Sequence, residues 1–511
     1  MADQVLIADA GIPQCMAELD PTLLRGANFG SKFGVRDSWV NVRWFGAVGD
    51  GIENDADAIR DAVTYALSKK RTLWFPPGVY GVAGSSGTDP TACIHISTVD
   101  GISVVADKMA TIKPLPEYGL SGSSKIVRVD GGNGTGRVSW VGGRFDLSAL
   151  PGTETGADGL SIGPKYRDVV IRESIFDHGL TALSGDHFGR GGGDSGLYVK
   201  ESEHLSITGC SFLGSYDLGI YLSSDINSAR IGRNASISSN LFYRCGGGIG
   251  AKRGFENLSI SGNQFIECGN GVFSGVADSN PLTASHLNIT GNLFRRTQGN
   301  SIRLTNTLNA TITGNEILDY RRWVSDGTTQ TSVSTGNIGG GVLLEGSSGV
   351  VATGNIIGFS EWLPVTDLSR ASPAVAIRDF SATGKSSNNN LFVGNLLVGA
   401  ESAFYISDGS SGNLISPNNV IDCINSDRLG ASETNRITQI NGGILSLLAN
   451  PAGSDVSIKA TGSDANIDIG LLPQGSGLVQ FGNFISDSGL IASGYIQIKD
   501  SSGAIRRLAV V

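Results

Sequence analysis

The sequence predicts an all-β fold, a parallel β-helix, in which the chain coils so that equivalent strands stack in parallel. A short motif, ITGNLF and its variants, recurs with its asparagine 23 residues apart, or 23 plus an insertion. A short strand with apolar second and fourth places, such as GLYVK or GIYLS, follows each motif. No helical period separates these strands, which argues against a leucine-rich repeat, whereas stacked coils satisfy each other's backbone groups.

The repeated motif predicts two buried columns of side chains. The first is an amide ladder made of Cys210, Asn240, Asn263, Asn292, Asn315, Asn355, Asn395 and Asn418. The second lies two residues later and is made of Phe176, Phe212, Phe242, Phe265, Phe294, Ile317, Ile357, Leu397 and Val420. Cys245 and Cys268 each follow their asparagine by five residues and are expected to stack as well. We assign all these positions to the core.

The composition excludes several classes of protein. A hydrophobic content of 40% argues against disorder, and 73 glycines without a G-X-Y period exclude collagen. The net charge of −9 argues against nucleic acid as a partner. The apolar runs are shorter than the roughly 18 residues that cross a bilayer, so no membrane insertion is expected.

Targeting and metal signals are also missing from the sequence. The start, MADQVLIADAG, does not have the pattern of a signal peptide, and we expect no export through one. The six cysteines form no CxxC pair and the five histidines have no metal-ligand spacing. We therefore expect buried free thiols, no metal site and no cofactor.

The stretch before the repeats predicts a helix over residues 54–69. Its apolar face is made of Ile59, Ala62, Val63, Ala66 and Leu67. Asn54 or Asp55 is expected to cap its first turn. Such a helix is suited to cover the open apolar end of a stack of coils.

Residues 41–82 carry a resemblance. VNVRWFGAVGDGIENDADAIRDAV and then TLWFPPGVYGV resemble the N-terminal motif of the pectate-lyase-like superfamily, and the coil repeats extend the likeness to about residue 425. The resemblance, together with the crossover rule for parallel strands, implies a right-handed β-helix over residues 41–428. It also implies that Asp50 and Asp55 are structural.

The two ends of the chain differ from the repeats. Residues 429–511 contain short strands with turns, and GYIQIKDSSGAIRRLAVV predicts a hairpin. This tail resembles the C-terminal trimerisation modules of bacteriophage tail spikes, which implies a homotrimer. Residues 1–40 are then expected to be a virion-anchoring segment that binds other phage tail proteins.

The alternating strands predict a carbohydrate groove. Their first, third and fifth places are expected to face outward, with small residues at the first place exposing the backbone. Aromatic rings and cations at the other places suit sugar rings and acidic groups, and six insertions are expected to wall this stripe. The candidate glycan-binding residues are Tyr198, Lys200, Arg253, Phe273, Arg303, Trp323, Trp362, Arg378, His187 and Asp186.

Two carboxylates are the first candidates for catalysis. Asp194 and Asp217 precede equivalent strands on adjacent coils, where like charges raise one pKa, as a general acid requires. Tyr221 and Lys252 complete this cluster. The alternative catalytic residues are Glu345 and Glu361.

These features favour a phage tailspike that binds and depolymerises a bacterial surface polysaccharide, capsule or O-antigen. Such a protein is carried on the virion and acts outside the host cell, at its surface. We favour glycoside hydrolysis. The alternatives are a polysaccharide lyase that acts on an acidic glycan, with a base among Tyr221, Lys252, Arg253 and His187, a non-catalytic receptor-binding spike, a bacterial uronan epimerase and, least favoured, a structural virion protein.

Overall fold

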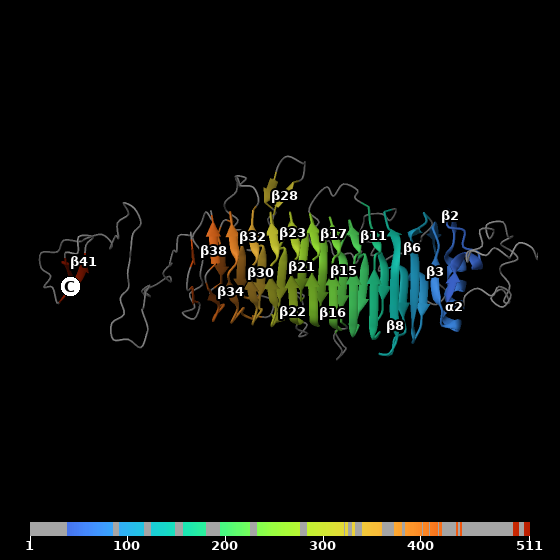
Figure 1. Ribbon diagram of the computed structural model, residues 1–511, viewed down its shortest axis with the longest axis horizontal. Coiled ribbons are helices and arrows are strands. Elements are labelled where there is room, and N and C mark those ends of the chain that lie inside the picture. Colours follow the sequence, from blue (N-terminus) through green and yellow to red (C-terminus); the bar gives the residue numbers. More distant parts are fainter. Residues whose placement is uncertain are drawn as a thin grey trace, which may run out of the picture. The chain divides into compact units, whose positions relative to one another are not determined.

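A computed structural model gives the fold (Figure 1). The residues that it describes are 38–84, 91–116, 124–148, 157–179, 195–224, 232–275, 284–320, 322–324, 330–332, 340–359, 373–380, 384–400, 402–407, 409–416, 418–421, 436–437, 440–441, 494–499 and 505–510. The chain divides into two compact units, Met1–Asn450 and Pro451–Val511.

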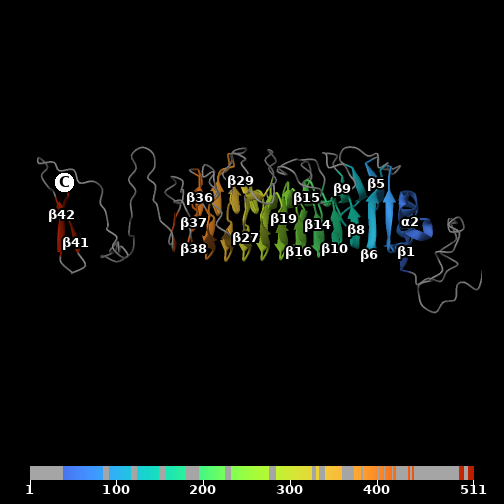
Figure 2. The ribbon, with the colours of Figure 1, turned by 90° about the horizontal axis from the view of Figure 1, so that it is seen from above.

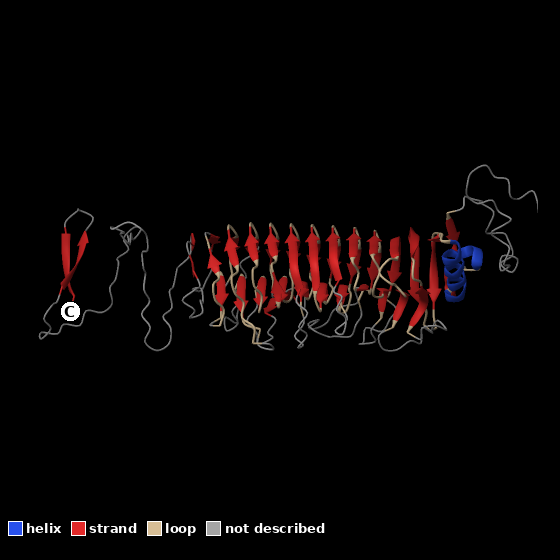
Figure 3. Cartoon of the chain, turned by 90° about the horizontal axis from the view of Figure 1, so that it is seen from below, coloured by secondary structure: helices blue, strands red, loops and turns tan. Residues whose placement is uncertain are grey.

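The first described elements close one end of the stack of coils (Figure 3). They are β1 (Trp39–Asn41), the short 3-10 helix η2 (Val42–Phe45), β2 (Asp50–Asn54), α2 (Ala56–Lys69), β3 (Thr72–Phe75) and β4 (Gly78–Val82). Helix α2 buries Ile59, Ala62, Val63 and Ala66 against the strands, as its pattern predicts.

The predicted cap is partly wrong. Asp55 makes no capping bond, because its carboxylate accepts hydrogen bonds from the backbone N–H groups of Val48 and Gly49, at 2.6 and 3.1 Å. The side chain of Asn54 instead accepts from Ala56 N at 3.2 Å. The carboxylate of Asp50 accepts from the backbone of the next turn, so both aspartates are structural here.

One all-parallel sheet, named here the front sheet, carries the alternating strands in sequence order (Figures 1 and 2). Its strands are β5 (Ala92–Ser97), β7 (Lys125–Asp130), β9 (Asp158–Ile162), β12 (Leu197–Lys200), β15 (Leu218–Ser223), β18 (Gly247–Lys252), β21 (Asn270–Ser274), β24 (Ile302–Thr305), β30 (Val342–Glu345), β33 (Val375–Arg378) and β36 (Phe404–Ile406).

The remaining strands of the coils, together with β1 to β4, form a second, larger parallel sheet that carries the asparagine motifs. They are β6 (Gly101–Pro114), β8 (Arg137–Asp146), β10 (Asp168–Arg172), β11 (Ile175–Asp177), β13 (His204–Thr208), β14 (Ser211–Leu213), β16 (Gly232–Ser238), β17 (Leu241–Tyr243), β19 (Phe255–Ser261), β20 (Gln264–Ile266), β22 (Ala284–Thr290), β23 (Leu293–Arg295), β25 (Thr307–Leu308), β26 (Thr311–Thr313), β27 (Glu316–Leu318), β31 (Val351–Thr353), β32 (Ile356–Gly358), β34 (Leu391–Val393), β35 (Leu396–Val398), β37 (Leu414–Ile415), β38 (Asn418–Ile421), β39 (Arg436–Ile437) and β40 (Ile440–Asn441).

Two antiparallel hairpins are also described. One joins β28 (Arg322–Val324) to β29 (Gln330–Ser332), within an insertion of the first unit. The other joins β41 (Gly494–Lys499) to β42 (Ile505–Val510) in the second unit, where the sequence predicts a hairpin. The boundary at 428/429 and the trimerisation role of the tail stay predictions.

The asparagine column is the predicted buried ladder. From Asn240 to Asn395, each asparagine side chain of the column donates to the amide oxygen of the next coil and to a backbone carbonyl, as Asn292 does to Asn315 at 3.0 Å and to Ile260 at 2.9 Å. The amide oxygen of Asn315 also accepts a hydrogen bond from the backbone N–H of Asn292. These hydrogen bonds therefore give the buried polar groups of the inner turn their partners without water. Cys245 and Cys268 are buried free thiols on adjacent coils, as expected.

The aromatic column packs against a column of small residues. Consecutive rings from Phe145 to Phe294 are parallel, with centroids 4.6 to 5.0 Å apart. The first-place glycines of the front sheet lie beside these rings: a Cβ on Gly219 would lie 2.5 Å from Phe242 Cδ1. The predicted outward orientation of the first place is therefore wrong. This place faces the core, and its small residues leave room for the rings.

This packing predicts that Gly219→Ala destabilises the fold by about 1–3 kcal/mol, because the added methyl group overlaps Phe242. Calorimetry measures the change as a lower unfolding temperature. The matched control is Ser236→Ala on the exposed face of β16, with an expected effect within about 0.5 kcal/mol. Equal unfolding temperatures for the two variants would contradict the close packing of the two columns.

Candidate functional site

The third places of the alternating strands align across the front sheet. Strand register confirms the predicted column and extends it toward the N-terminus. The aligned residues are His95, Arg128, Ser161, Tyr198, Tyr221, Gly250, Phe273, Arg303, Leu343, Ala376 and Tyr405. Leu343 and Ala376 are buried, so the C-terminal part of this column is not an open stripe.

Two tyrosines form the centre of the candidate site. The rings of Tyr198 and Tyr221 lie on adjacent coils with centroids 5.0 Å apart and a tilt of 46°. Lys252 Nζ lies 4.5 Å from the centroid of Tyr221 and 5.7 Å from that of Phe273. Aromatic faces beside a cation can bind both the apolar face of a sugar ring and an anionic substituent.

Asp217 lies at the edge of this platform, directly before β15. Its carboxylate Oδ2 is 3.9 Å from Lys252 Nζ, and only 17% of the side chain is exposed. Burial raises the pKa of Asp217, and the charge of Lys252 opposes part of this rise. A largely buried carboxyl with a raised pKa has the property that a general acid requires.

The two phenols are poor proton acceptors. Burial raises the pKa of Tyr221 to about 12 and also raises the pKa of Tyr198, while Arg253 lowers both pKa values slightly. Both hydroxyl groups therefore stay protonated at neutral pH and can donate hydrogen bonds. A lyase base would need the opposite shift.

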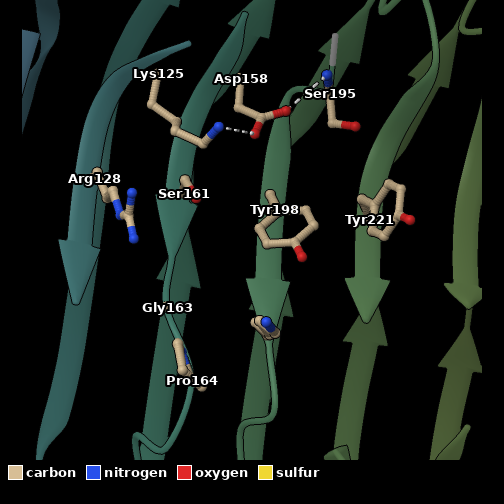
Figure 4. A pocket seen from close by; sticks show the side chains of 10 residues that line it. Lys125, Arg128, Asp158, Ser161, Gly163, Pro164, Ser195, Tyr198 and Tyr221 are labelled. Atoms are coloured by element: carbon tan, nitrogen blue, oxygen red, sulfur yellow. Dashed lines mark hydrogen bonds and ion pairs between the residues drawn. The ribbon is translucent and has the colours of Figure 1, made fainter. Parts of the chain in front are cut away.

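A hollow of about 370 Å³ opens beside the tyrosines, toward the N-terminal coils (Figure 4). Its lining residues are Lys125, Arg128, Asp158, Ser161, Gly163, Pro164, Ser195, Tyr198, Lys200 and Tyr221. Asp158 is buried at the start of β9; its Oδ2 lies 3.8 Å from Lys125 Nζ, and its Oδ1 accepts from Ser195 N at 3.1 Å.

Sequence reasoning missed the N-terminal half of this hollow. Lys125, Arg128 and Asp158 lie on coils that precede the first asparagine motif, so the repeat did not assign them to the stripe. A signal was nevertheless present, because GLSIG at residues 159–163 has the same alternating pattern as GLYVK.

Glu345, one of the alternative catalytic residues, forms ion pairs farther along the front sheet. Glu345 is buried between Arg303, at 2.6 Å, and Arg378, at 2.9 Å, and it also accepts from Thr305. Burial favours a raised pKa for Glu345, but the two guanidinium groups outweigh it and lower the pKa. This geometry suits a charge-compensated structural group rather than a proton donor.

Other candidates fall outside the described residues. These are Asp186, His187, Asp194, Glu361 and Trp362, together with most of the predicted walls. Trp323 lies in β28, and only its backbone belongs to the described part of the chain. The pairing of Asp194 with Asp217 therefore stays a prediction.

Two family models match parts of the chain. Residues 39–89 match the rhamnogalacturonase A/epimerase, pectate lyase-like model. Residues 153–283 match the model of the right-handed β-helix region. The fold is a right-handed parallel β-helix. No curated protein sequence matches the chain significantly.

Solved structures share this β-helix at low sequence identity. The Dettilon tailspike protein (gp208) is 14% identical with a TM-score of 0.50, covering 78% of this chain and 68% of its own. The exopolygalacturonase of Thermotoga maritima is 14% identical with a TM-score of 0.46, covering 79% and 91%. The A-module of the Azotobacter vinelandii mannuronan C-5 epimerase AlgE6 is 15% identical with a TM-score of 0.45, covering 80% and 100%. At 14% identity the likeness to the tailspike protein concerns the fold alone.

The described residues contain neither a metal-binding cluster nor a membrane-spanning helix. No group of three or more His, Cys, Asp or Glu side chains in this part of the chain is arranged to hold a metal ion. Among the helices described, none is both long and apolar enough to span a membrane.

Proposed function

We propose that the protein binds a polysaccharide across the front sheet and depolymerises it by glycoside hydrolysis. The observation that carries this proposal is the cluster of Asp217, Lys252 and Tyr221 beside the cation-lined hollow. It combines a proton donor, aromatic surface and hydrogen-bond donors on a rigid sheet. The family-model match at residues 39–89 supports a polysaccharide as the substrate.

In this proposal one carboxyl group acts as the general acid and a second as the general base. Asp217 donates a proton to the glycosidic oxygen, and Asp158 accepts a proton from the attacking water. Asp158 begins β9 and Asp217 precedes β15, with β12 between them. Two strand spacings place their backbones ~10 Å apart, close to the ~6.5–9.5 Å between the carboxyl groups of inverting glycosidases. The predicted partner Asp194 is the alternative second carboxylate.

The biological setting belongs to the same proposal. We infer a phage tailspike that acts on capsule or O-antigen at the surface of the host cell. In this arrangement residues 429–511 hold a homotrimer and residues 1–40 attach to other tail proteins. The resemblance of the tail to trimerisation modules and the β41–β42 hairpin within it support this setting.

The test is incubation of the purified chain with a panel of bacterial surface polysaccharides of known composition, followed by size-exclusion chromatography. Shortening of at least one polysaccharide is expected. Binding without shortening would instead identify a receptor-binding spike, and absence of both binding and shortening would reject the proposed function.

The raised pKa of Asp217 predicts a pH dependence. Activity requires the protonated acid, so kcat falls as the pH rises through its pKa. Lys252 lowers that pKa, so Lys252→Met is expected to raise it and move the alkaline limb of kcat to higher pH. Lys70→Met is the matched control, because Lys70 is exposed beside Asp100 and is not among the groups that shift the pKa of Asp217. A limb that stays in place or moves to lower pH in Lys252→Met would contradict Asp217 as the acid.

A further inference from the structure

The hollow beside the tyrosines is lined by cationic side chains that have no role in the proposed proton transfers. Lys125, Arg128 and Lys200 contribute three cations to its lining, whereas two carboxylates face them, Asp158 in the lining and Asp130 beside Arg128, so one positive charge is in excess. The chain as a whole has a net charge of −9, so the local charge of the hollow is opposite in sign to that of the chain. Such a pocket attracts an anionic group and repels cations.

Arg128 is held in place by a chain of polar contacts. Its Nε lies 2.9 Å from Asp130 Oδ2, and the other oxygen of the same carboxylate lies 2.8 Å from His95 Nε2. These contacts restrict the orientation of the guanidinium, which lines the hollow near Ser161 (Figure 4). A guanidinium that is oriented before the ligand arrives binds a planar carboxylate at lower entropic cost.

Ser195 provides a second, independent sign of a ligand. It lines the hollow and is fully buried, yet within the part of the chain described its Oγ has no hydrogen-bond partner. A buried hydroxyl without a partner costs free energy that a ligand oxygen or nitrogen can recover. Its backbone N–H already donates to Asp158, which fixes the residue in the lining of the hollow.

We propose that this hollow is a subsite for an acidic sugar residue, which binds through its carboxylate. Arg128 and Lys200 bind the carboxylate, Ser195 Oγ bonds to a sugar oxygen, and Tyr198 packs against the ring. The inference rests on the proposed function, because it places an acidic unit beside the bond that Asp217 protonates. It excludes neutral polysaccharides as the preferred substrate.

The test uses the polysaccharide that the protein shortens, before and after its carboxyl groups are reduced to alcohols with carbodiimide and borohydride. We expect an acidic substrate, and we expect reduction to raise KM by about tenfold to a hundredfold, as for the loss of charge-assisted hydrogen bonds. A neutral substrate, or an acidic one cleaved equally well after reduction, overturns the subsite and leaves the proposed function standing. Failure to shorten or bind any polysaccharide overturns both.

Variants separate recognition from structure. Arg128→Gln and Lys200→Met are expected to raise KM about tenfold or more for the native polysaccharide, with little change for the carboxyl-reduced one. Arg295→Gln, on the outer face of the other sheet, is the control and should change neither. Equal losses on both substrates would indicate a structural role for Arg128 and Lys200 and would overturn the assignment.

Discussion

Asp217→Asn is expected to lower kcat for depolymerisation by about 10²–10⁴-fold, the usual contribution of a positioned acid. The amide keeps the size of the side chain but cannot donate the proton at the required moment. Asp217 lies at a strand edge and pairs only loosely with Lys252, at 3.9 Å, so the fold should be kept. Rates of product formation measure the loss, and circular dichroism checks the fold.

Variants of Asp158 and Asp194 identify which carboxylate acts as the general base. Asp158→Asn is expected to lower kcat to a similar degree, whereas Asp100→Asn, at an exposed ion pair with Lys70, is the matched control. A full loss in Asp194→Asn with normal activity in Asp158→Asn would return the second role to Asp194. Normal activity in Asp217→Asn together with inactive Glu361→Gln would move the site to the other predicted cluster.

Asn292→Ala is expected to destabilise the β-helix by about 3 kcal/mol, because several buried hydrogen bonds are lost together. The side chain donates to Ile260 O and Asn315 Oδ1, and it accepts from both the backbone and the side chain of Asn263. Removing it leaves these buried groups without partners in the middle of a continuous ladder.

The equilibrium constant of unfolding in urea measures this effect and should rise about a hundredfold, since each ~1.4 kcal/mol corresponds to a factor of ten. Asn288→Ala is the matched control, because Asn288 is exposed on the neighbouring strand and accepts from the hydroxyl groups of two threonines. Its effect should stay within about 0.5 kcal/mol. Similar free energies of unfolding for the two variants would contradict the ladder as a main source of stability.

The fold was predictable from the repeat because every coil buries the same kinds of side chain at the same positions. A buried asparagine and a buried aromatic residue at fixed spacing allow few arrangements other than stacked coils, and helix α2 follows from its apolar face. The orientation of the first place was mispredicted because strict alternation does not hold there: in β15 the neighbouring residues Gly219 and Ile220 are both buried. Gly219 faces the ring of Phe242 rather than solvent.

The candidate site was predictable only in part. Tyr198, Tyr221, Lys252 and Asp217 belong to the regular strands, so their register could be counted from the sequence. Asp158 and the other N-terminal lining residues lie on coils without the asparagine motif, and their place depends on strand pairing over long sequence distances. Likewise, the charge compensation of Glu345 by two arginines depends on side-chain geometry that no spacing reveals.

The central claim is that the protein hydrolyses a glycosidic bond at this cluster, and the mass of the products made in water enriched in ¹⁸O tests it most directly. We predict that each new reducing end contains one ¹⁸O atom and that Asp217→Asn gives almost none of these products. Products that contain no added water and absorb in the ultraviolet, as unsaturated sugars do, would contradict hydrolysis.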